Sequence, residues 1–170
     1  MTDERLGERL WAAIARLPDG EAGIVFRHYA TPEYERAALA SRIAQACRER
    51  RIALAIAGDV ALARALGADL VHNPRETAAM PFSVSIHNLD EAREARRRGA
   101  ALVFVSSVNP TRSHPGKPAL GPELGAGLAR AAGVSAIALG GMTEAAFSAL
   151  PDGAFHGWAG IDAWISDGDG

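Results

Sequence analysis

The stretch Leu102–Gly121, with the sequence LVFVSSVNPTRSHPGKPALG, decides the fold. It begins inside a short apolar run, Ala101–Val105, which is rich in β-forming residues and lacks the polar alternation of a half-exposed strand. Such a run is typical of a strand that is buried on both faces, as in a parallel sheet. We therefore expect a parallel sheet with this strand inside it.

The second half of the stretch predicts an anion-binding loop. Three prolines interrupt it, and prolines reduce the entropy that a loop loses when it becomes ordered. Its polar side chains are hydrogen-bond donors or cations, and none is acidic: Ser106, Ser107, Asn109, Thr111, Arg112, Ser113, His114 and Lys117. This chemistry suits phosphate or pyrophosphate. The alternative is an ordinary polar surface loop that carries basic residues by chance.

Composition narrows the class of protein. The 170 residues suit one domain, expected over residues 1–165, with residues 166–170 as a flexible tail. A net charge of −2 gives no overall basic surface for nucleic acid or membrane. The single Cys47 excludes an internal disulfide, and its Ala-rich helical surroundings predict a buried hydrophobic residue. Without a signal peptide or a long apolar run, the chain is expected to be cytoplasmic.

Apolar runs alternate with helical patterns along the whole chain. The first helix is expected over 2–17, and later helices begin at caps: Thr31, Asp59, and Asn88 paired with Glu91 in a capping box. Seven strands are expected, over 23–27, 52–57, 69–72, 82–86, 101–105, 135–139 and 156–161. Such alternation predicts a parallel sheet, either doubly wound or closed into a barrel.

The position of the polar residues favours the barrel. They follow nearly every strand: Arg27, His72, Ser85, His87, Ser106, Ser107, the Gly140-Gly141 pair and Asp162. A barrel brings all of these loops to one mouth, whereas an open sheet uses only its crevice. We therefore predict an α/β (β/α)₈ TIM barrel.

Four segments together resemble the thiamine phosphate synthase and thiazole tautomerase superfamily. They are Arg27 after its strand, Ser85-Ile86-His87-Asn88, Phe104–Gly121 with its Pro-Thr-x-Ser core, and Ile137–Met142. Their order and spacing hold from about Thr2 to Trp164. The family fold is a (β/α)₈ barrel whose first strand ends in Thr-Asp-Glu, here Thr2-Asp3-Glu4. The resemblance thus implies a truncated first strand, through either a late start codon or a gapped, seven-stranded barrel.

The resemblance also implies an activity in thiamine biosynthesis. The synthase is a transferase that joins hydroxymethylpyrimidine pyrophosphate to thiazole phosphate and releases pyrophosphate, with Mg²⁺ and basic residues neutralising the leaving group. Carried over by position, the implied catalytic residues are Arg27 and Ser85; His114 stands where the family has a lysine, and we include it as a catalytic candidate because a histidine can act as acid or base near neutral pH. The implied substrate- and phosphate-binding residues are Thr111, Ser113, Gly140 and Gly141, the glycine pair through backbone N–H groups at a helix N-terminus. The composition of the loop adds Arg112 and Lys117 as phosphate-binding candidates.

The chain departs from the family at the expected metal site. The family's Mg²⁺-binding aspartates align with Gly58 and Thr77, although Asp59 and Glu76 each lie one residue away. Mg²⁺ rarely binds protein without a carboxylate, so we assign no metal ligand. Asp162 replaces a small residue near the implied thiazole phosphate site.

Three functions remain open on the sequence. The leading interpretation is a synthase-like enzyme acting on phosphorylated heterocycles. The second is a non-catalytic binder of thiamine phosphates or their precursors, and the third is a tautomerase or isomerase of a phosphorylated thiazole that uses His114 as acid or base. The tautomerase's catalytic histidine aligns with Ser107, which argues against the third. His72 and His87 are expected to satisfy local hydrogen bonds. The sequence leaves open whether the protein forms a homo-oligomer.

Overall fold

A computed structural model describes residues 1–111, 116 and 118–165. These residues divide into two compact units: unit 1 contains the described residues of 1–81 with Trp164 and Ile165, and unit 2 contains the described residues of 82–163. Four predicted anion-binding residues, Arg112, Ser113, His114 and Lys117, lie outside the described residues, as does the expected tail. That the two units form one domain stays a prediction.

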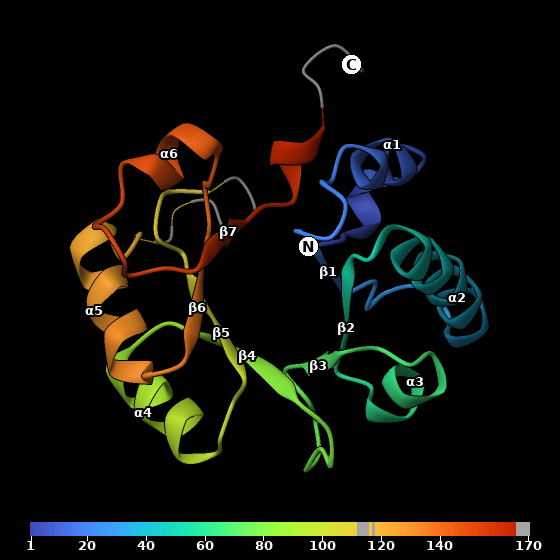
Figure 1. The fold of residues 1–170 in the computed structure, drawn as a ribbon, viewed down its shortest axis with the longest axis horizontal. Helices are drawn as coiled ribbons and strands as arrows, with labels where there is room; N and C mark the ends of the chain where they lie inside the picture. The colour runs from blue at the N-terminus through green and yellow to red at the C-terminus, as the bar shows by residue number, and fades with distance from the viewer. Residues whose placement is uncertain (112–115, 117, 166–170) are drawn as a thin grey trace. The chain divides into compact units, whose positions relative to one another are not determined.

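Unit 1 contains three parallel strands that pair in chain order. They are β1 (Gly23–Phe26), β2 (Ala53–Ala57) and β3 (Leu70–His72). Helix α2 (Glu33–Arg50) connects β1 to β2, and helix α3 (Val60–Ala65) connects β2 to β3. Figure 1 shows both helices on the same side of these strands. The strand ends that carry Arg27, Gly58 and Asn73 therefore face the same edge of the sheet.

The beginning of unit 1 differs from the single helix expected over 2–17. A 3₁₀ helix, Glu4–Leu6, and helix α1 (Arg9–Ala15) replace it. Gly7 separates the two with a φ of +49°, a conformation that favours glycine and interrupts a right-handed helix. Before them, Thr2 lies beside β1, because its N–H donates to the carbonyl oxygen of Val25 at 2.9 Å.

The helix starts of unit 1 confirm one predicted cap and correct another. Asp59 caps α3, with its Oδ1 accepting the N–H of Leu62 at 2.8 Å. Thr31 is not the cap of α2, because the N-cap position is Pro32 and no side chain caps the helix. Cys47 is buried in α2, and burial raises the pKa of its thiol to about 11. The cysteine is thus the buried hydrophobic residue that the sequence predicted.

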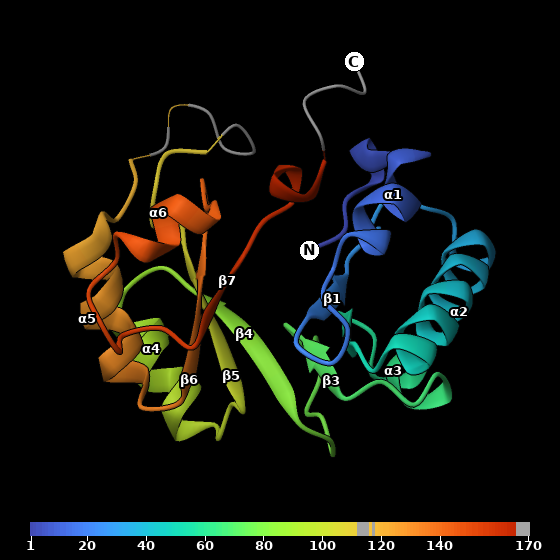
Figure 2. The same ribbon diagram turned by 45° about the horizontal axis from the view of Figure 1, so that its top comes forward.

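Unit 2 contains four parallel strands, also paired in chain order. They are β4 (Phe82–Ile86), β5 (Leu102–Ser106), β6 (Ser135–Leu139) and β7 (Gly157–Ala159). Their helices are α4 (Leu89–Arg97), α5 (Pro122–Ala132) and α6 (Glu144–Ser148), and a 3₁₀ helix, Asp162–Trp164, follows β7. Helices α4 and α5 lie side by side (Figure 2). Strand β7 is shorter than expected and ends before Ile161.

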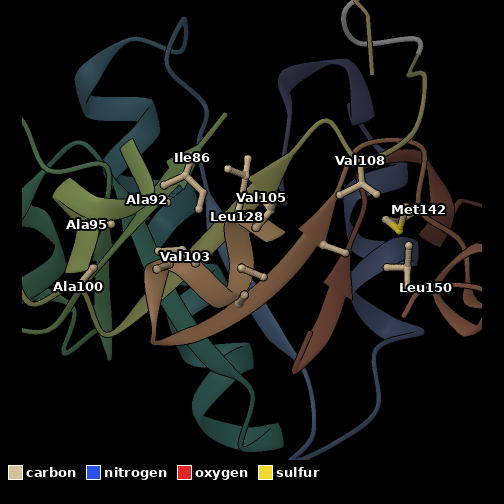
Figure 3. Packing of buried hydrophobic residues seen from close by; sticks show 14 residues of the cluster. Ile86, Ala92, Ala95, Ala100, Val103, Val105, Val108, Leu128, Met142 and Leu150 are labelled. Atoms are coloured by element: carbon tan, nitrogen blue, oxygen red, sulfur yellow. The ribbon is translucent and has the colours of Figure 1, made fainter. Parts of the chain in front are cut away.

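The core of unit 2 is formed by β5 and the helices beside it (Figure 3). Three consecutive residues of β5, Val103, Phe104 and Val105, are buried, so both faces of this strand are covered, as its apolar run predicted. Ala92 and Ala95 of α4 are small enough to let the helix approach the strands closely.

The described residues confirm the parallel α/β class and the seven expected strands, while closure into a barrel stays a prediction. No helix within the described ranges combines the length and the apolar character needed to cross a membrane.

Candidate functional site

The end of β1 presents Arg27 and Tyr29 to solvent. His28 between them is buried and stacks on Phe26, with 4.8 Å between ring centroids. Its Nδ1 lies 3.0 Å from Thr2 Oγ1, which also accepts the N–H of Arg27. Arg27 Cζ lies 5.8 Å from the centroid of the Tyr29 ring. The buried histidine therefore fixes the backbone from which the two flanking side chains extend.

The end of β2 is organised by Arg36 of α2. Its Nη2 donates to the carbonyl oxygen of Ala57 at 2.8 Å, and its Nη1 lies 3.3 Å from Asp59 Oδ2. The guanidinium group also lies over the Phe26 ring, 5.4 Å from the centroid. Since Asp59 Oδ1 accepts the N–H of Leu62, both carboxylate oxygens of Asp59 already have protein partners.

The residues at the implied magnesium site do not fit that ion. Gly58 and Thr77 carry no carboxylate, and Asp59 uses both of its oxygens within the fold. Glu76, the other displaced carboxylate, is exposed. Throughout the described part of the chain, no three His, Cys, Asp or Glu side chains gather as a metal site. Mg²⁺ requires hard oxygen ligands, and the described residues at this position do not offer a set of them.

A guanidinium group lies over Gly58 instead. A Cβ atom built on Gly58 would lie 3.5 Å from Arg75 Nε and 3.8 Å from Tyr29 Cε1. Arg75 belongs to the loop between β3 and β4, and Gly58 has a φ of +75°. The position where the resemblance implies an aspartate is therefore bordered by a cation and an aromatic ring.

Two histidines satisfy local hydrogen bonds, as expected. His72 at the end of β3 is buried, and its Nε2 lies 3.2 Å from Asn73 Nδ2. Burial, and secondarily the charge of Arg27, lower the pKa of His72 to about 4, so its ring is neutral at pH 7. His87 Nδ1 lies 2.8 Å from Glu91 Oε2. Burial alone would raise the pKa of Glu91, but its bonds to His87 outweigh burial and lower it.

In unit 2, the first residues of the predicted anion loop pack on the Gly140-Gly141 turn. Val108 N–H donates to Leu139 O at 2.9 Å, and Asn109 N–H donates to Gly140 O at 3.1 Å. A Cβ atom on Gly140 would lie 2.6 Å from Ser107 Cβ, and one on Gly141 would lie 2.3 Å from Pro110 O. Only glycine permits this approach at either position.

The glycine pair does not lie in the first turn of a helix. Helix α6 begins at Glu144, is five residues long, and is capped by Thr143, whose Oγ1 accepts the N–H of Ala146 at 3.2 Å. What holds the glycine pair in place is its contact with residues 107–110. Any phosphate bound here would therefore meet a loop and a turn.

The other described residues predicted in unit 2 lie at the ends of β4 and β5 or in the loop that follows β5. Ser85 lies on β4, in register with Phe104 of β5, and is partly buried. Ser106 Oγ lies 3.3 Å from Ser107 Oγ, and Ser107 in turn borders Gly140. Thr111, also partly buried, directly follows residues 107–110, which pack on the glycine turn. Sequence reasoning missed Arg36, Arg75 and the bond made by Asn109, because each contact joins residues far apart along the chain.

The family model and the similar proteins that match this chain all carry names from thiamine biosynthesis. The family described as thiamine monophosphate synthase matches residues 1–164. The "Thiamine biosynthesis bifunctional protein ThiED" of Geobacter sulfurreducens is 30% identical over 98% of this chain, which spans 36% of that protein's length. The "Thiamine-phosphate synthase" of Thiobacillus denitrificans is 31% identical over 85% of this chain and 75% of its own length.

Among solved structures, the thiamine phosphate pyrophosphorylase from Pyrococcus furiosus is similar, with a TM-score of 0.77 and 23% identity over 95% of this chain and 83% of that one. The protein of the same name from Bacteroides thetaiotaomicron has a TM-score of 0.60 and 18% identity, and the comparison covers 93% of this chain and 77% of that one. At these identities the likeness concerns the fold alone. Because the family match extends over residues 1–164, the chain belongs to the thiamine monophosphate synthase family.

Proposed function

We propose that the chain is a thiamine phosphate synthase-like transferase of thiamine biosynthesis, acting in the cytoplasm and built on the family's (β/α)₈ barrel. It would join hydroxymethylpyrimidine pyrophosphate to thiazole phosphate and release pyrophosphate. The family match over residues 1–164 supports this proposal, as do the names of the relatives from Geobacter and Thiobacillus.

The observation that carries the proposal is the contact between the anion loop and the Gly140-Gly141 turn in unit 2. Residues 107–110 rest on two glycines whose Cβ atoms, if present, would collide with them. The resemblance assigns the thiazole phosphate to this turn. Glycines leave backbone N–H groups approachable by a phosphate, and a turn of this kind suits an anion.

The remaining site residues would neutralise the charge of the substrates and hold them in position. In unit 1, Arg27 would oppose the negative charge that develops on the pyrophosphate leaving group. In unit 2, the hydroxyl groups of Ser85 and Thr111 would donate hydrogen bonds to substrate oxygens. Arg112, Ser113, His114 and Lys117 lie outside the described residues, and their roles stay predictions from the sequence.

A second candidate is a non-catalytic binder of thiamine phosphates or their precursors. The engagement of both Asp59 oxygens by Arg36 and Leu62 favours it, since a protein that has lost the metal ligands can still bind the anions. The two candidates differ only in turnover.

Turnover is tested by incubating the purified protein with both substrates and separating thiamine phosphate by chromatography. The proposal expects thiamine phosphate and pyrophosphate in equal amounts, loss of both in Arg27→Ala, and no change in Arg64→Ala, an exposed arginine of α3. Binding of both substrates without any product would contradict the enzyme and support the binder. Absence of both product and binding would contradict both candidates.

A further inference from the structure

Arg75 lies at the position where the resemblance implies a metal-binding aspartate, and Arg27 lies against the tyrosine that borders the same position. Arg75 Nε and Tyr29 Cε1 both lie within 4 Å of the point where a Gly58 Cβ would stand. Arg27 Cζ lies 5.8 Å from the centroid of the same Tyr29 ring. Two guanidinium groups therefore border one half-exposed tyrosine beside Gly58.

Three carboxylates close to these strand ends already have partners, and one of them is Glu4, whose Oε1 accepts the N–H of Ala30 at 2.7 Å. Asp59 is paired with Arg36, and Asp3 is held by Arg5, whose Nε lies 2.8 Å from Asp3 Oδ1. Within the described ranges, neither Arg27 nor Arg75 forms a salt bridge. The guanidinium groups of Arg27 and Arg75 thus carry positive charge that no described carboxylate pairs with.

This charge has the chemistry of an anion site. A guanidinium group presents planar N–H donors that match two phosphate oxygens at once, and it needs no metal to do so. Gly58 contributes by having no side chain, because any longer side chain would extend toward Arg75. A carboxylate at this position would pair with Arg75 and repel an anion.

We propose that Arg27 and Arg75 bind a pyrophosphate group directly over Gly58, without a bridging divalent cation. The proposal rests on the proposed function only for its choice of ligand, since the geometry belongs to unit 1 alone. In this chain, guanidinium groups would supply the charge neutralisation that the resemblance assigns to a metal ion.

The test is calorimetric titration of the whole chain with sodium pyrophosphate in the presence of EDTA. The wild type should bind, Arg75→Ala should bind at least about tenfold more weakly, and Arg64→Ala should match the wild type, since losing one charge-assisted contact commonly has an effect of this size. Arg75 is exposed, so its removal should leave the fold intact, which circular dichroism would verify.

A second pair of variants isolates the charge at position 58. Gly58→Asp and Gly58→Asn have nearly the same shape, and both residue types tolerate the positive φ of this position better than others do. Gly58→Asp should weaken metal-free pyrophosphate binding at least about tenfold relative to Gly58→Asn, because its carboxylate would pair with Arg75.

The outcomes separate this inference from the proposed function. Binding that requires Mg²⁺, or equal affinity in the wild type and Arg75→Ala, overturns the inference even if the protein makes thiamine phosphate. Metal-free binding that is lost in Arg75→Ala supports the inference even if no product forms, and in that case the enzyme proposal fails alone.

Discussion

Arg36 and Asp59 form an ion pair at the end of β2, with 3.3 Å between Arg36 Nη1 and Asp59 Oδ2. The pair joins α2 to the first turn of α3, because Asp59 also caps that helix through the N–H of Leu62. The side chain of Arg36 is 12% exposed and that of Asp59 is 41% exposed, so water screens the pair only from the side of the carboxylate. A carboxylate that the family resemblance suggested as a displaced metal ligand is thus part of the fold.

Arg36→Ala should destabilise the protein by about 1.5–3 kcal/mol, because it removes bonds to both the Ala57 carbonyl and the Asp59 carboxylate. Urea unfolding measures the change. The control, Arg64→Ala, removes an exposed arginine and should change stability by about 0.5 kcal/mol or less. Equal losses in the two variants would contradict the structural role of Arg36.

Asp59→Ala should be more destabilising than Asp59→Asn by about 1 kcal/mol, because an asparagine oxygen can still accept the Leu62 N–H and cap α3. Repeating the comparison in the Arg36→Ala background separates the two roles of Asp59. There the cost of Asp59→Asn should fall, since the lost charge no longer has its partner, while the cost of losing the cap should remain. Identical costs in both backgrounds would mean that the ion pair contributes nothing.

Local features of this chain could be predicted from the sequence. Asn88 and Glu91 form the predicted capping-box-like pair: Asn88 Oδ1 accepts the Glu91 N–H, and Glu91 Oε1 accepts from the Asn88 side chain, while Glu91 Oε2 accepts the N–H of His87. Asp59 caps α3 as predicted, and the apolar run of β5 is buried on both faces. These signals succeed because each depends on residues a few positions apart.

The contacts that define the candidate site could not be predicted in this way. Arg36 is one of several arginines in α2, and only the folded chain brings it to Asp59. Arg75 reaches Gly58 across seventeen positions, and the collision partners of Gly141 come from another loop. The prediction of one helix over 2–17 was wrong for a local reason. The apolar spacing continues through Gly7, but the backbone conformation of this glycine breaks the helix there.

His72 predicts a specific dependence of stability on pH. Its pKa is about 4 in the folded protein and returns to its ordinary 6.5 when the chain unfolds, because burial and Arg27 disfavour the charged ring. Below pH 6.5 the unfolded chain binds the extra proton, so stability falls as the pH falls from about 6.5 to about 4. Between pH 7 and pH 5 the loss due to His72 should be about 2 kcal/mol.

The matched variant is His72→Gln, which keeps a polar side chain beside Asn73 but cannot titrate. Its stability should change less between pH 7 and pH 5 than that of the wild type, as measured by urea unfolding at both values. Burial also lowers the pKa of His28, and this contribution is present in both proteins, so it cancels in the difference. Parallel pH profiles would show that His72 is not held neutral by the fold.

The last prediction concerns the turn that positions the anion loop. Gly141→Ala would place a Cβ atom 2.3 Å from the backbone oxygen of Pro110, a contact that requires the loop to move. Gly153→Ala is the matched control, because Gly153 lies in the same unit and has a similar φ, +69° against +58°, but has no atom within 4 Å of its Cβ position. Both variants should lose about 1 kcal/mol from the positive φ.

Gly141→Ala alone should lose a further 1–3 kcal/mol or so from the collision, which is typical of overpacking. It should also weaken binding of thiazole phosphate, measured by calorimetry, because relief of the collision moves residues 107–110 away from the turn. Gly153→Ala should leave that affinity unchanged. Equal stability losses in the two variants would show that the loop does not rest on Gly141. Equal affinities, with the stability difference intact, would show that the docked loop serves the fold and takes no part in binding the phosphate.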